Sequence, residues 1–344
     1  MNEMNLSAVC DIIANAGRTL VLGHVNPDAD CLGSAFALAE IIRMCGGEAS
    51  VACDGTVPDR LAFMCGEVLL PDKALSRSFD TVLSVDVASP SQLGALGELI
   101  PLVKLMIDHH STGAPFADSL IDTKAAAAGE IVYRIYKELV FSGKIGTSTT
   151  VQRLLYAAIS SDCGSFKFSN TTPHTHEIAS ELVAGINSST DGGADTAEIA
   201  RLLFGRFTVR EMTAKMIAIQ NLRFYEDGRL GVVVFSKETL DSNGLDENDI
   251  GNAVETPRCI DGVLVALSVR QTAERTYKIS SRANAEIDCA AVCALYGGGG
   301  HTRAAGCTVT ADTAADAEKL AVDAFGAAVR GYVASHDGKK TKLI

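Results

Sequence analysis

The sequence predicts an α/β protein with two domains: an N-terminal domain with a mostly parallel sheet flanked by helices, and a smaller C-terminal α/β domain with a mixed sheet. In the first part of the chain, short apolar runs rich in β-forming residues alternate with segments of helical periodicity, which is typical of parallel β-α-β units. A second alternation begins near residue 222, after a helical stretch without strand patterns. We therefore expect a first domain at 1–186, a helical linker at 187–221 and a second domain at 222–344.

The elements of the first domain follow from this alternation. Short apolar runs predict strands at 19–22, 49–53, 81–85 and 104–107. Apolar residues at helical spacing predict helices at about 6–16, 31–45, 59–65, 91–97, 125–140, 149–160 and 173–184.

The second domain opens with a predicted hairpin at 223–236, with Asp227-Gly228, a favoured two-residue turn, at its turn. Alternating apolar patterns predict further strands at 262–271, 277–283 and 306–311, and helical periodicity predicts helices at 287–296 and 314–334.

Composition limits the classes of function. The net charge is −12, which argues against long duplex DNA or RNA as a partner held by bulk electrostatics. No apolar run approaches the roughly 20 residues of a membrane span, and the N-terminus lacks the pattern of a signal peptide. The ten cysteines include no CxxC pair, so we interpret them as reduced thiols and expect a cytoplasmic protein.

Acidic and imidazole side chains gather where the predicted strands end. His24, Asp28 and Asp30 follow the first strand, and Asp86 follows the strand at 81–85. Asp108-His109-His110 ends the strand at 104–107, and Asp162 ends the helix at 149–160. The carboxyl edge of a parallel sheet is where open α/β folds hold their ligands. A cluster of carboxylates there requires positive charge, and a divalent cation is the simplest source.

The donor types indicate which cation. Carboxylate and imidazole ligands without thiolate favour Mn²⁺ or Mg²⁺, and the number of acids exceeds what one ion needs. We therefore expect two divalent ions, most simply Mn²⁺, about 3.5–4 Å apart. Cys31 and Cys163 flank two of these acids, but we interpret them as packing residues. A structural alternative exists for Asp30, which could cap the helix that begins near Leu32.

The stretches HVNPDAD, VDVAS, IDHH and SDCGSF, in this order, resemble the DHH family of phosphoesterases. The resemblance implies that His24 and Asp28 bind one ion, that Asp30, His109 and Asp162 bind the other, and that Asp86 bridges the two. It further implies that His110 contacts the scissile phosphate or the leaving group, and that Asp108 holds the imidazoles in place.

The second domain contains GGGGHTRAAG at 297–306, which is similar to a glycine loop of the DHH-associated C-terminal domain. Consecutive glycines let backbone N–H groups approach an anion closely. The resemblance implies that Gly299, Gly300 and His301 contact the nucleotide part of the substrate. It also implies that Arg282 binds a terminal phosphate, a task that suits a planar bidentate donor.

The resemblance implies a two-metal phosphoesterase that hydrolyses short oligoribonucleotides or dinucleotides, of the nanoRNase type, and that also removes the 3′-phosphate of phosphoadenosine phosphate. Two alternatives stay open: a cyclic di-AMP phosphodiesterase and a non-catalytic nucleotide-binding regulator. A regulator would be marked by the loss of a metal ligand, and no ligand is lost. The expected partners are short RNA or a small nucleotide, with no membrane, and the family suggests a homodimer.

Overall fold

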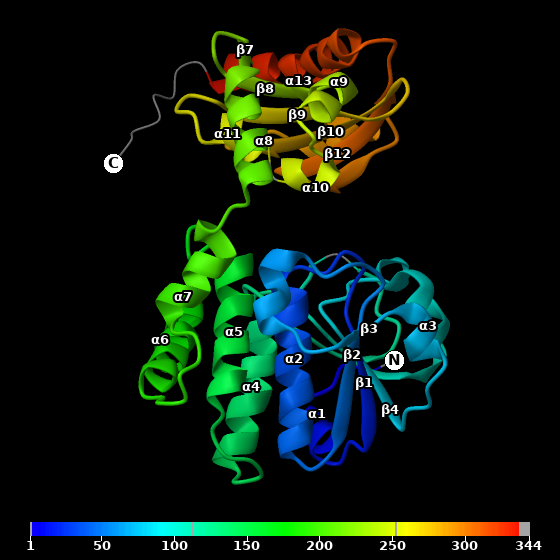
Figure 1. Ribbon diagram of the computed structural model, residues 1–344, viewed down its shortest axis with the longest axis vertical. Helices are drawn as coiled ribbons and strands as arrows, with labels where there is room; N and C mark the ends of the chain where they lie inside the picture. Colours follow the sequence, from blue (N-terminus) through cyan, green and yellow to red (C-terminus); the bar gives the residue numbers. More distant parts are fainter. Residues whose placement is uncertain (1, 112, 252, 337–344) are drawn as a thin grey trace. The chain divides into compact units, whose positions relative to one another are not determined.

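The computed structural model describes residues 2–111, 113–251 and 253–336. The chain forms two compact units, 1–206 and 207–344, which are described separately. Figure 1 shows the chain coloured by sequence.

Sheet A of the first unit consists of six parallel strands in the order β3-β2-β1-β4-β5-β6. From β1 the chain builds outward through β2 and β3 on one side, and then returns to place β4, β5 and β6 on the other. The order therefore reverses between β1 and β4, which is the point where such sheets bind ligands. The strands are β1 (Arg18–Leu22), β2 (Glu48–Ala52), β3 (Val68–Leu69), β4 (Thr81–Val85), β5 (Val103–Asp108) and β6 (Asp118–Ile121).

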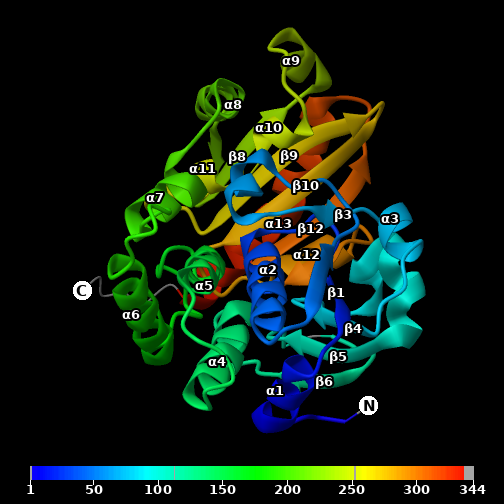
Figure 2. The ribbon, with the colours of Figure 1, turned by 60° about the horizontal axis from the view of Figure 1, so that its bottom comes forward.

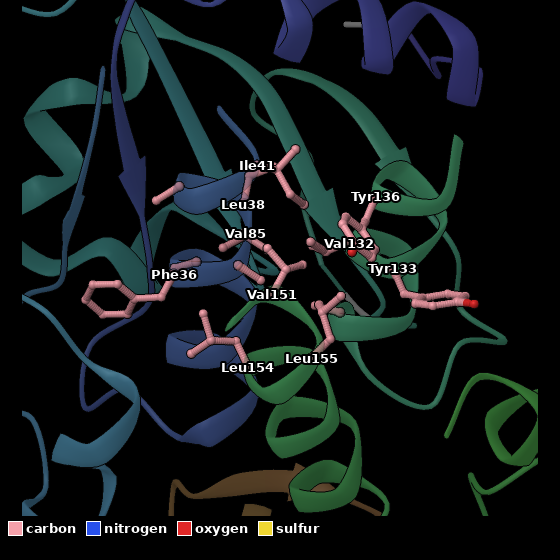
Figure 3. Close-up of a cluster of buried hydrophobic side chains, with 14 of the residues drawn as sticks. Phe36, Leu38, Ile41, Val85, Val132, Tyr133, Tyr136, Val151, Leu154 and Leu155 are labelled. Atoms are coloured by element: carbon pink, nitrogen blue, oxygen red, sulfur yellow. The ribbon is translucent and has the colours of Figure 1, made fainter. Parts of the chain in front are cut away.

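Helices cover both faces of sheet A, because its strands are apolar on both sides. The helical segments of this unit are α1 (Leu6–Ala14), α2 (Ala29–Met44), η1 (Asp59–Met64), α3 (Pro71–Leu75), η2 (Pro90–Leu102), α4 (Ala128–Phe141), α5 (Thr149–Asp162), α6 (Pro173–Asn187), α7 (Thr196–Ala200) and η3 (Arg201–Gly205). On one face α2, α4 and α5 run side by side (Figure 1). Leu38, Val132, Val151 and Leu155 converge there on Val85 of β4 (Figure 3). The other face packs against α3 and η2.

Close packing between α2 and α5 sets the positions of two predicted ligand stretches. At Gly33 a β-carbon would lie 2.8 Å from the Leu154 carbonyl oxygen and 2.9 Å from the Ala158 β-carbon, so the two helices approach as closely as a glycine permits. Because α2 begins just after Asp28 and α5 ends at Asp162, this contact fixes one end of each helix relative to the other.

Sheet B of the second unit is mixed, with the order β11-β12-β10-β9-β8-β7 and a single parallel pair, β8 with β9. Its strands are β7 (Arg223–Tyr225), β8 (Leu230–Phe235), β9 (Val265–Ala273), β10 (Thr276–Ala283), β11 (Gly299–His301) and β12 (Ala304–Thr310). The helices are α8 (Val209–Gln220), α9 (Lys237–Ser242), α10 (Glu247–Ile250), α11 (Glu255–Arg258), α12 (Cys289–Ala294) and α13 (Ala314–His336). Figure 2 shows β8, β9 and β10 side by side.

The two faces of sheet B differ in character. Along β10, Tyr277, Ile279, Ser281 and Ala283 are buried on the side that packs against α12 and α13, while the residues between them are partly or fully exposed. The exposed face of β10 therefore presents Lys278, Ser280 and Arg282. This alternation confirms the strand predicted at 277–283.

The predicted fold class is confirmed: sheet A is parallel and sheet B is mixed. The stretch 187–221, expected to be a linker, contributes α7 and η3 to the first unit and α8 to the second. The glycine run, expected to be a loop, contains the short edge strand β11, which pairs with β12. Among the described residues, no helix is both long enough and apolar enough to cross a bilayer.

Candidate metal centre

Asp86 lies at the centre of the candidate site, directly after β4 at the reversal of strand order. Its backbone has φ +59°, an uncommon left-handed conformation for a non-glycine residue, and its N–H donates to the Ile107 carbonyl at 2.9 Å. The side chain is 2 % exposed, yet its Oδ1 has no hydrogen-bond partner among the described residues. A buried carboxylate oxygen without a donor is costly, so this geometry favours a cation.

His24 and Asp28 approach Asp86 from the β1–α2 loop. The Nδ1–H of His24 donates to the Val25 carbonyl at 2.8 Å, which leaves Nε2 to face the carboxylates. That Nε2 lies 3.5 Å from Asp86 Oδ2 and 3.8 Å from Asp28 Oδ1. Asp28 is also the N-cap of α2, because its Oδ1 accepts the Cys31 N–H at 3.0 Å.

His109 approaches Asp86 from the other side. Its Nε2 lies 3.6 Å from Asp86 Oδ1, 3.8 Å from Asp30 Oδ2 and 3.8 Å from Asp162 Oδ2. Its Nδ1 faces the Ala125 carbonyl at 3.2 Å, so this ring too turns Nε2 toward the carboxylates. The structure thus brings together the six side chains predicted as metal ligands, grouped on two sides of Asp86.

Asp30 is held by a contact that the sequence did not indicate. It does not cap its own helix, since Asp28 does so. Instead, its Oδ2 accepts the Ala128 N–H at 2.7 Å and its Oδ1 accepts the Gly129 N–H at 3.0 Å, both from the first turn of α4. The Ser34 hydroxyl donates to Oδ1 at 3.0 Å. The positive end of α4 therefore orients and stabilises this buried carboxylate, across a separation in sequence that no local pattern reveals.

His110 and Asp108 form a pair beside the centre. The His110 Nδ1–H donates to Asp108 Oδ1 at 2.8 Å, and this hydrogen bond raises the pKa of His110 above its ordinary value. Asp108 is 2 % exposed, whereas the His110 side chain is 30 % exposed. His110 can therefore present its second ring nitrogen as a hydrogen-bond donor to a bound anion.

The electrostatics of the cluster show a shortage of positive charge. Burial raises the pKa of Asp162 to about 6; His109 opposes this, and the Asp86 and Asp28 carboxylates add to it. Burial also raises the pKa of Asp30, with Asp86 and Asp162 contributing. Burial alone would lower the pKa of His24, but Asp28 and Asp86 raise it to about 11. Ionised carboxylates this close together repel one another, and a bound divalent cation would offset that repulsion.

The donor atoms fit divalent cations. There are three groups of three side chains in which one donor atom from each member lies within 4.8 Å of the donor atoms of the other two. The groups are His24 with Cys31 and Asp86, Asp86 with His109 and His110, and Asp30 with His109 and Asp162. Asp86 belongs to two of these groups, as a bridging ligand requires. Oxygen and imidazole nitrogen dominate, which suits Mn²⁺ or Mg²⁺.

The residues predicted to contact the nucleotide lie in the second unit. Arg282 of β10 and His301 of β11 both stand opposite Ala304 of β12, so the two side chains leave the same face of sheet B, two strands or roughly 10 Å apart. This is the exposed face, and Ala304 between them leaves space for a ligand. The Arg282 side chain is 30 % exposed; its guanidinium donates to the Ser281 carbonyl at 3.0 Å, and its Nε lies 3.9 Å from Glu255 Oε1.

Gly299 and Gly300 lie beside this pair. Gly300 has φ +139°, and a β-carbon there would lie 2.6 Å from the Ala304 carbonyl oxygen, so the close pairing of β11 with β12 requires glycine. At Gly299 a β-carbon would meet nothing within 4 Å, which leaves an open surface next to His301.

A parallel α/β sheet with clustered acids and histidines at its switch point, followed by a mixed-sheet unit with a basic face, defines a two-domain metal-dependent phosphoesterase architecture. The model of the DHH family N-terminal domain matches residues 18–159, and that of the DHHA1 domain matches residues 229–331. This chain therefore belongs to the DHH family and carries the associated DHHA1 domain.

Curated relatives share most of the chain. It is 27 % identical over 293 residues to the bifunctional oligoribonuclease and PAP phosphatase NrnA of Bacillus subtilis, covering 83 % of this chain and 87 % of the relative. It is 26 % identical to the protein of the same name from Thermus thermophilus, covering 85 % and 84 %. The fold is similar to that of an exopolyphosphatase-related protein from Bacteroides fragilis, with a TM-score of 0.83, 22 % identity and coverage of 95 % and 96 %.

Proposed function

We propose that this protein is a phosphoesterase that uses two divalent ions, most simply Mn²⁺, to hydrolyse short oligoribonucleotides and to remove the 3′-phosphate of phosphoadenosine phosphate. The observation that carries the proposal is the convergence of His24, Asp28, Asp30, Asp86, His109 and Asp162 on one edge of sheet A. The named activities of the B. subtilis and T. thermophilus relatives support the substrate class.

The metal assignment follows the two sides of Asp86. His24 and Asp28 would hold one ion, Asp30, His109 and Asp162 the other, and Asp86 would contribute one oxygen to each. When bound, the ions supply an activated water and neutralise the charge that develops on the phosphate. A relative from Streptococcus thermophilus is named a probable manganese-dependent inorganic pyrophosphatase, and it matches 49 % of this chain, which supports manganese.

The remaining polar residues position the substrate. His110 would donate a hydrogen bond to the scissile phosphate or to the leaving oxygen, and Asp108 would keep its ring oriented and its proton on Nδ1. Arg282 and His301 would bind the nucleotide part, with the open backbone at Gly299 and Gly300 beside them. All ten cysteines are free thiols, which supports a reducing compartment such as the cytoplasm.

A cyclic di-AMP phosphodiesterase is the second candidate. Relatives of that name from Geobacillus thermodenitrificans and Listeria monocytogenes are 25 % and 23 % identical, but this chain covers only 48 % and 50 % of their lengths. The comparison therefore favours the oligoribonuclease and phosphatase activities.

A panel of substrates tests the proposal. The purified protein is assayed with Mn²⁺ against a ribonucleotide trimer, the dinucleotide pApA, phosphoadenosine phosphate and cyclic di-AMP at equal concentration. We expect hydrolysis of the first three at a higher kcat/KM than that of cyclic di-AMP, and its loss with a chelator. A preference for cyclic di-AMP would support the second candidate, and binding without hydrolysis would instead identify a nucleotide-binding regulator.

A further inference from the structure

Cys31 lies at the edge of the candidate metal centre. It is fully buried near the start of α2, between the predicted ligand Asp30 and Leu32. Its Sγ, a ring nitrogen of His24 and a carboxylate oxygen of Asp86 all lie within 4.8 Å of one another. A thiol therefore faces the same space as two of the proposed ligands, although the sequence suggested only a packing role.

The position of this sulfur is fixed by its surroundings. The backbone N–H of His24 donates to Cys31 Sγ at 3.3 Å. A β-carbon at residue 23 would lie 2.5 Å from Cys31 Sγ and 2.8 Å from Cys53 Sγ, so Gly23 is what lets the sulfur pack against this loop. The His24 ring uses Nδ1 to contact Val25, so Nε2 is the nitrogen available to share a cation with the sulfur.

A second observation indicates that a cation belongs in this cluster. Asp86 is 2 % exposed, and its Oδ1 has no hydrogen-bond partner within the described part of the chain. That oxygen faces His109, while Oδ2 of the same carboxylate lies 3.5 Å from His24 Nε2, so Cys31 adjoins a buried carboxylate that is only partly compensated.

Cys163 offers a direct contrast. It also follows a predicted ligand, Asp162, and it is also fully buried. Its Sγ contacts the Ser160 carbonyl at 3.7 Å and accepts the Phe166 N–H at 3.3 Å. Among the described residues it belongs to none of the groups able to hold a metal. Of the two cysteines beside predicted ligands, only Cys31 is placed to bind an ion.

We propose that Cys31 is a latent thiolate ligand on the His24 side of the centre, so that thiophilic cations such as Cd²⁺ and Zn²⁺ bind there tightly and inhibit the enzyme. The inference rests on the proposed metal centre. Thiolate prefers soft cations, whereas the oxygen and imidazole donors alone suit Mn²⁺. Binding forms a sulfur–metal bond and releases the thiol proton to solvent, without electron transfer.

The test compares the wild-type protein with Cys31→Ser and with the matched control Cys163→Ser. Metal-free samples are titrated with Cd²⁺, and the ultraviolet sulfur-to-cadmium charge-transfer absorption is recorded. We expect a band that saturates at the first equivalent in the wild type and in Cys163→Ser and that is lost in Cys31→Ser. Affinity for Cd²⁺ should fall by at least about tenfold in Cys31→Ser, while affinity for Mn²⁺ changes by less than about threefold.

Inhibition gives a second readout. Cd²⁺ added to the Mn²⁺-loaded enzyme should inhibit the wild type and Cys163→Ser at concentrations that leave Cys31→Ser active. An equal band, or equal inhibition, in wild type and Cys31→Ser would overturn the inference. Absence of hydrolysis together with a Cys31-dependent band would reject the proposed function and leave the thiolate ligand standing.

The variants replace a buried sulfur, so their folding is checked by thermal unfolding. Should both Cys31→Ser and Cys31→Ala fail to fold, X-ray absorption at the cadmium edge of the wild-type protein with one equivalent of Cd²⁺ decides the question. One sulfur neighbour supports Cys31 as a ligand, and a shell of only oxygen and nitrogen excludes it.

Discussion

His24 and His109 each turn one ring nitrogen toward a backbone carbonyl and the other toward a group of carboxylates. The carbonyl contact holds the proton on Nδ1, so in each ring Nε2 is the nitrogen that can bind an ion, with release of any proton it carries. The orientation of these ligands is therefore set by the fold of the loops and does not depend on the metal.

At the residue scale, His109→Ala should abolish most of the activity. The variant removes the nitrogen that faces Asp30, Asp86 and Asp162, so we expect kcat to fall by at least about 10²-fold with little change in fold. His174→Ala is the control, because His174 is an exposed histidine on α6 whose Nδ1 lies 3.2 Å from Glu177 Oε2, away from the predicted ligands. Steady-state kinetics and metal content are measured for both; near wild-type rates with a full metal content in His109→Ala would contradict the assignment.

The effect of Mn²⁺ on stability should depend on pH. The pKa of Asp162 is raised from 3.8 to about 6 in the metal-free fold, so protonation of Asp162 favours the folded state between these values, and that contribution is lost as pH rises through about 6. Binding of Mn²⁺ requires the ionised carboxylate and reverses this penalty. The increase in Tm caused by Mn²⁺ should therefore be several degrees at pH 7.5 and clearly smaller at pH 5. Calorimetry at both values checks this, and a pH-independent increase would exclude Asp162 as a ligand.

The meeting of these acids and histidines at one edge of sheet A could be predicted from sequence, because their motifs follow apolar strands or end a helix. The orientation of Asp30 could not, since its partners on α4 are about a hundred residues away. The left-handed backbone conformation of Asp86 could not be predicted either, because nothing in the sequence VDVAS requires it. The metal-facing position of Cys31 depends on how the loop at Gly23 folds, and so it too needed the structure.

At the scale of elements, the contact between α2 and α5 governs the distance between the two ends that carry Asp28, Asp30 and Asp162. No side chain separates the helices at Gly33, so their relative position depends on backbone contact with Leu154 and on the Ala158 methyl group. Cores of this density tolerate added volume poorly.

Gly33→Ala should therefore destabilise the first unit by about 1–3 kcal/mol, despite the better helix propensity of alanine. The matched control is Gly97→Ala in η2, where within the described part of the chain a new methyl group would meet Ile100 Cδ1 at 3.9 Å and no closer atom. Thermal unfolding by calorimetry distinguishes them. An unchanged or higher Tm in Gly33→Ala would show that the helices can separate without cost.

The long periodic helices and the central strands were predictable, because their patterns extend over several turns or are continuous apolar runs. The edge strands β3 and β6 were not, since they are only two and four residues long. The strand at Gly299–His301 could not be predicted for another reason. Glycine has a low strand propensity, and pairing with β12 overrides this propensity.

At the scale of the whole molecule, the two units carry different kinds of site: the first holds the acids and histidines, and the second holds Arg282 and His301 on an exposed sheet face. If the first unit performs catalysis and the second binds the nucleotide, substitutions in the two units should affect the kinetics differently. The division was predictable from the order of the motifs along the chain. The shared face of Arg282 and His301 was not, because it depends on the register of β10, β12 and β11.

Arg282→Ala and His301→Ala should each lower kcat/KM for pApA by at least about tenfold, because positioning a substrate by its remote groups contributes strongly to the rate. Both should retain Mn²⁺ binding and hydrolysis of bis-p-nitrophenyl phosphate, which offers the second unit little to bind. Kinetics with both substrates, alongside Arg229→Ala as a control at a half-exposed arginine elsewhere in the unit, measure the difference. Equal losses on the two substrates would mean that these residues support folding.

The reversal of strand order between β1 and β4 affects when the site is assembled as the protein is synthesised and folds. The ligands come from segments that start at His24 and end at Asp162, and they meet only when β1, β4, β5, α2 and α5 have all assembled. A ribosome-bound chain that lacks α5 also lacks Asp162, so it holds an incomplete set of the proposed ligands. With the proposed ligands, we expect tight metal binding only after α5 has packed against α2, so that affinity for the ions would follow the completion of the first unit.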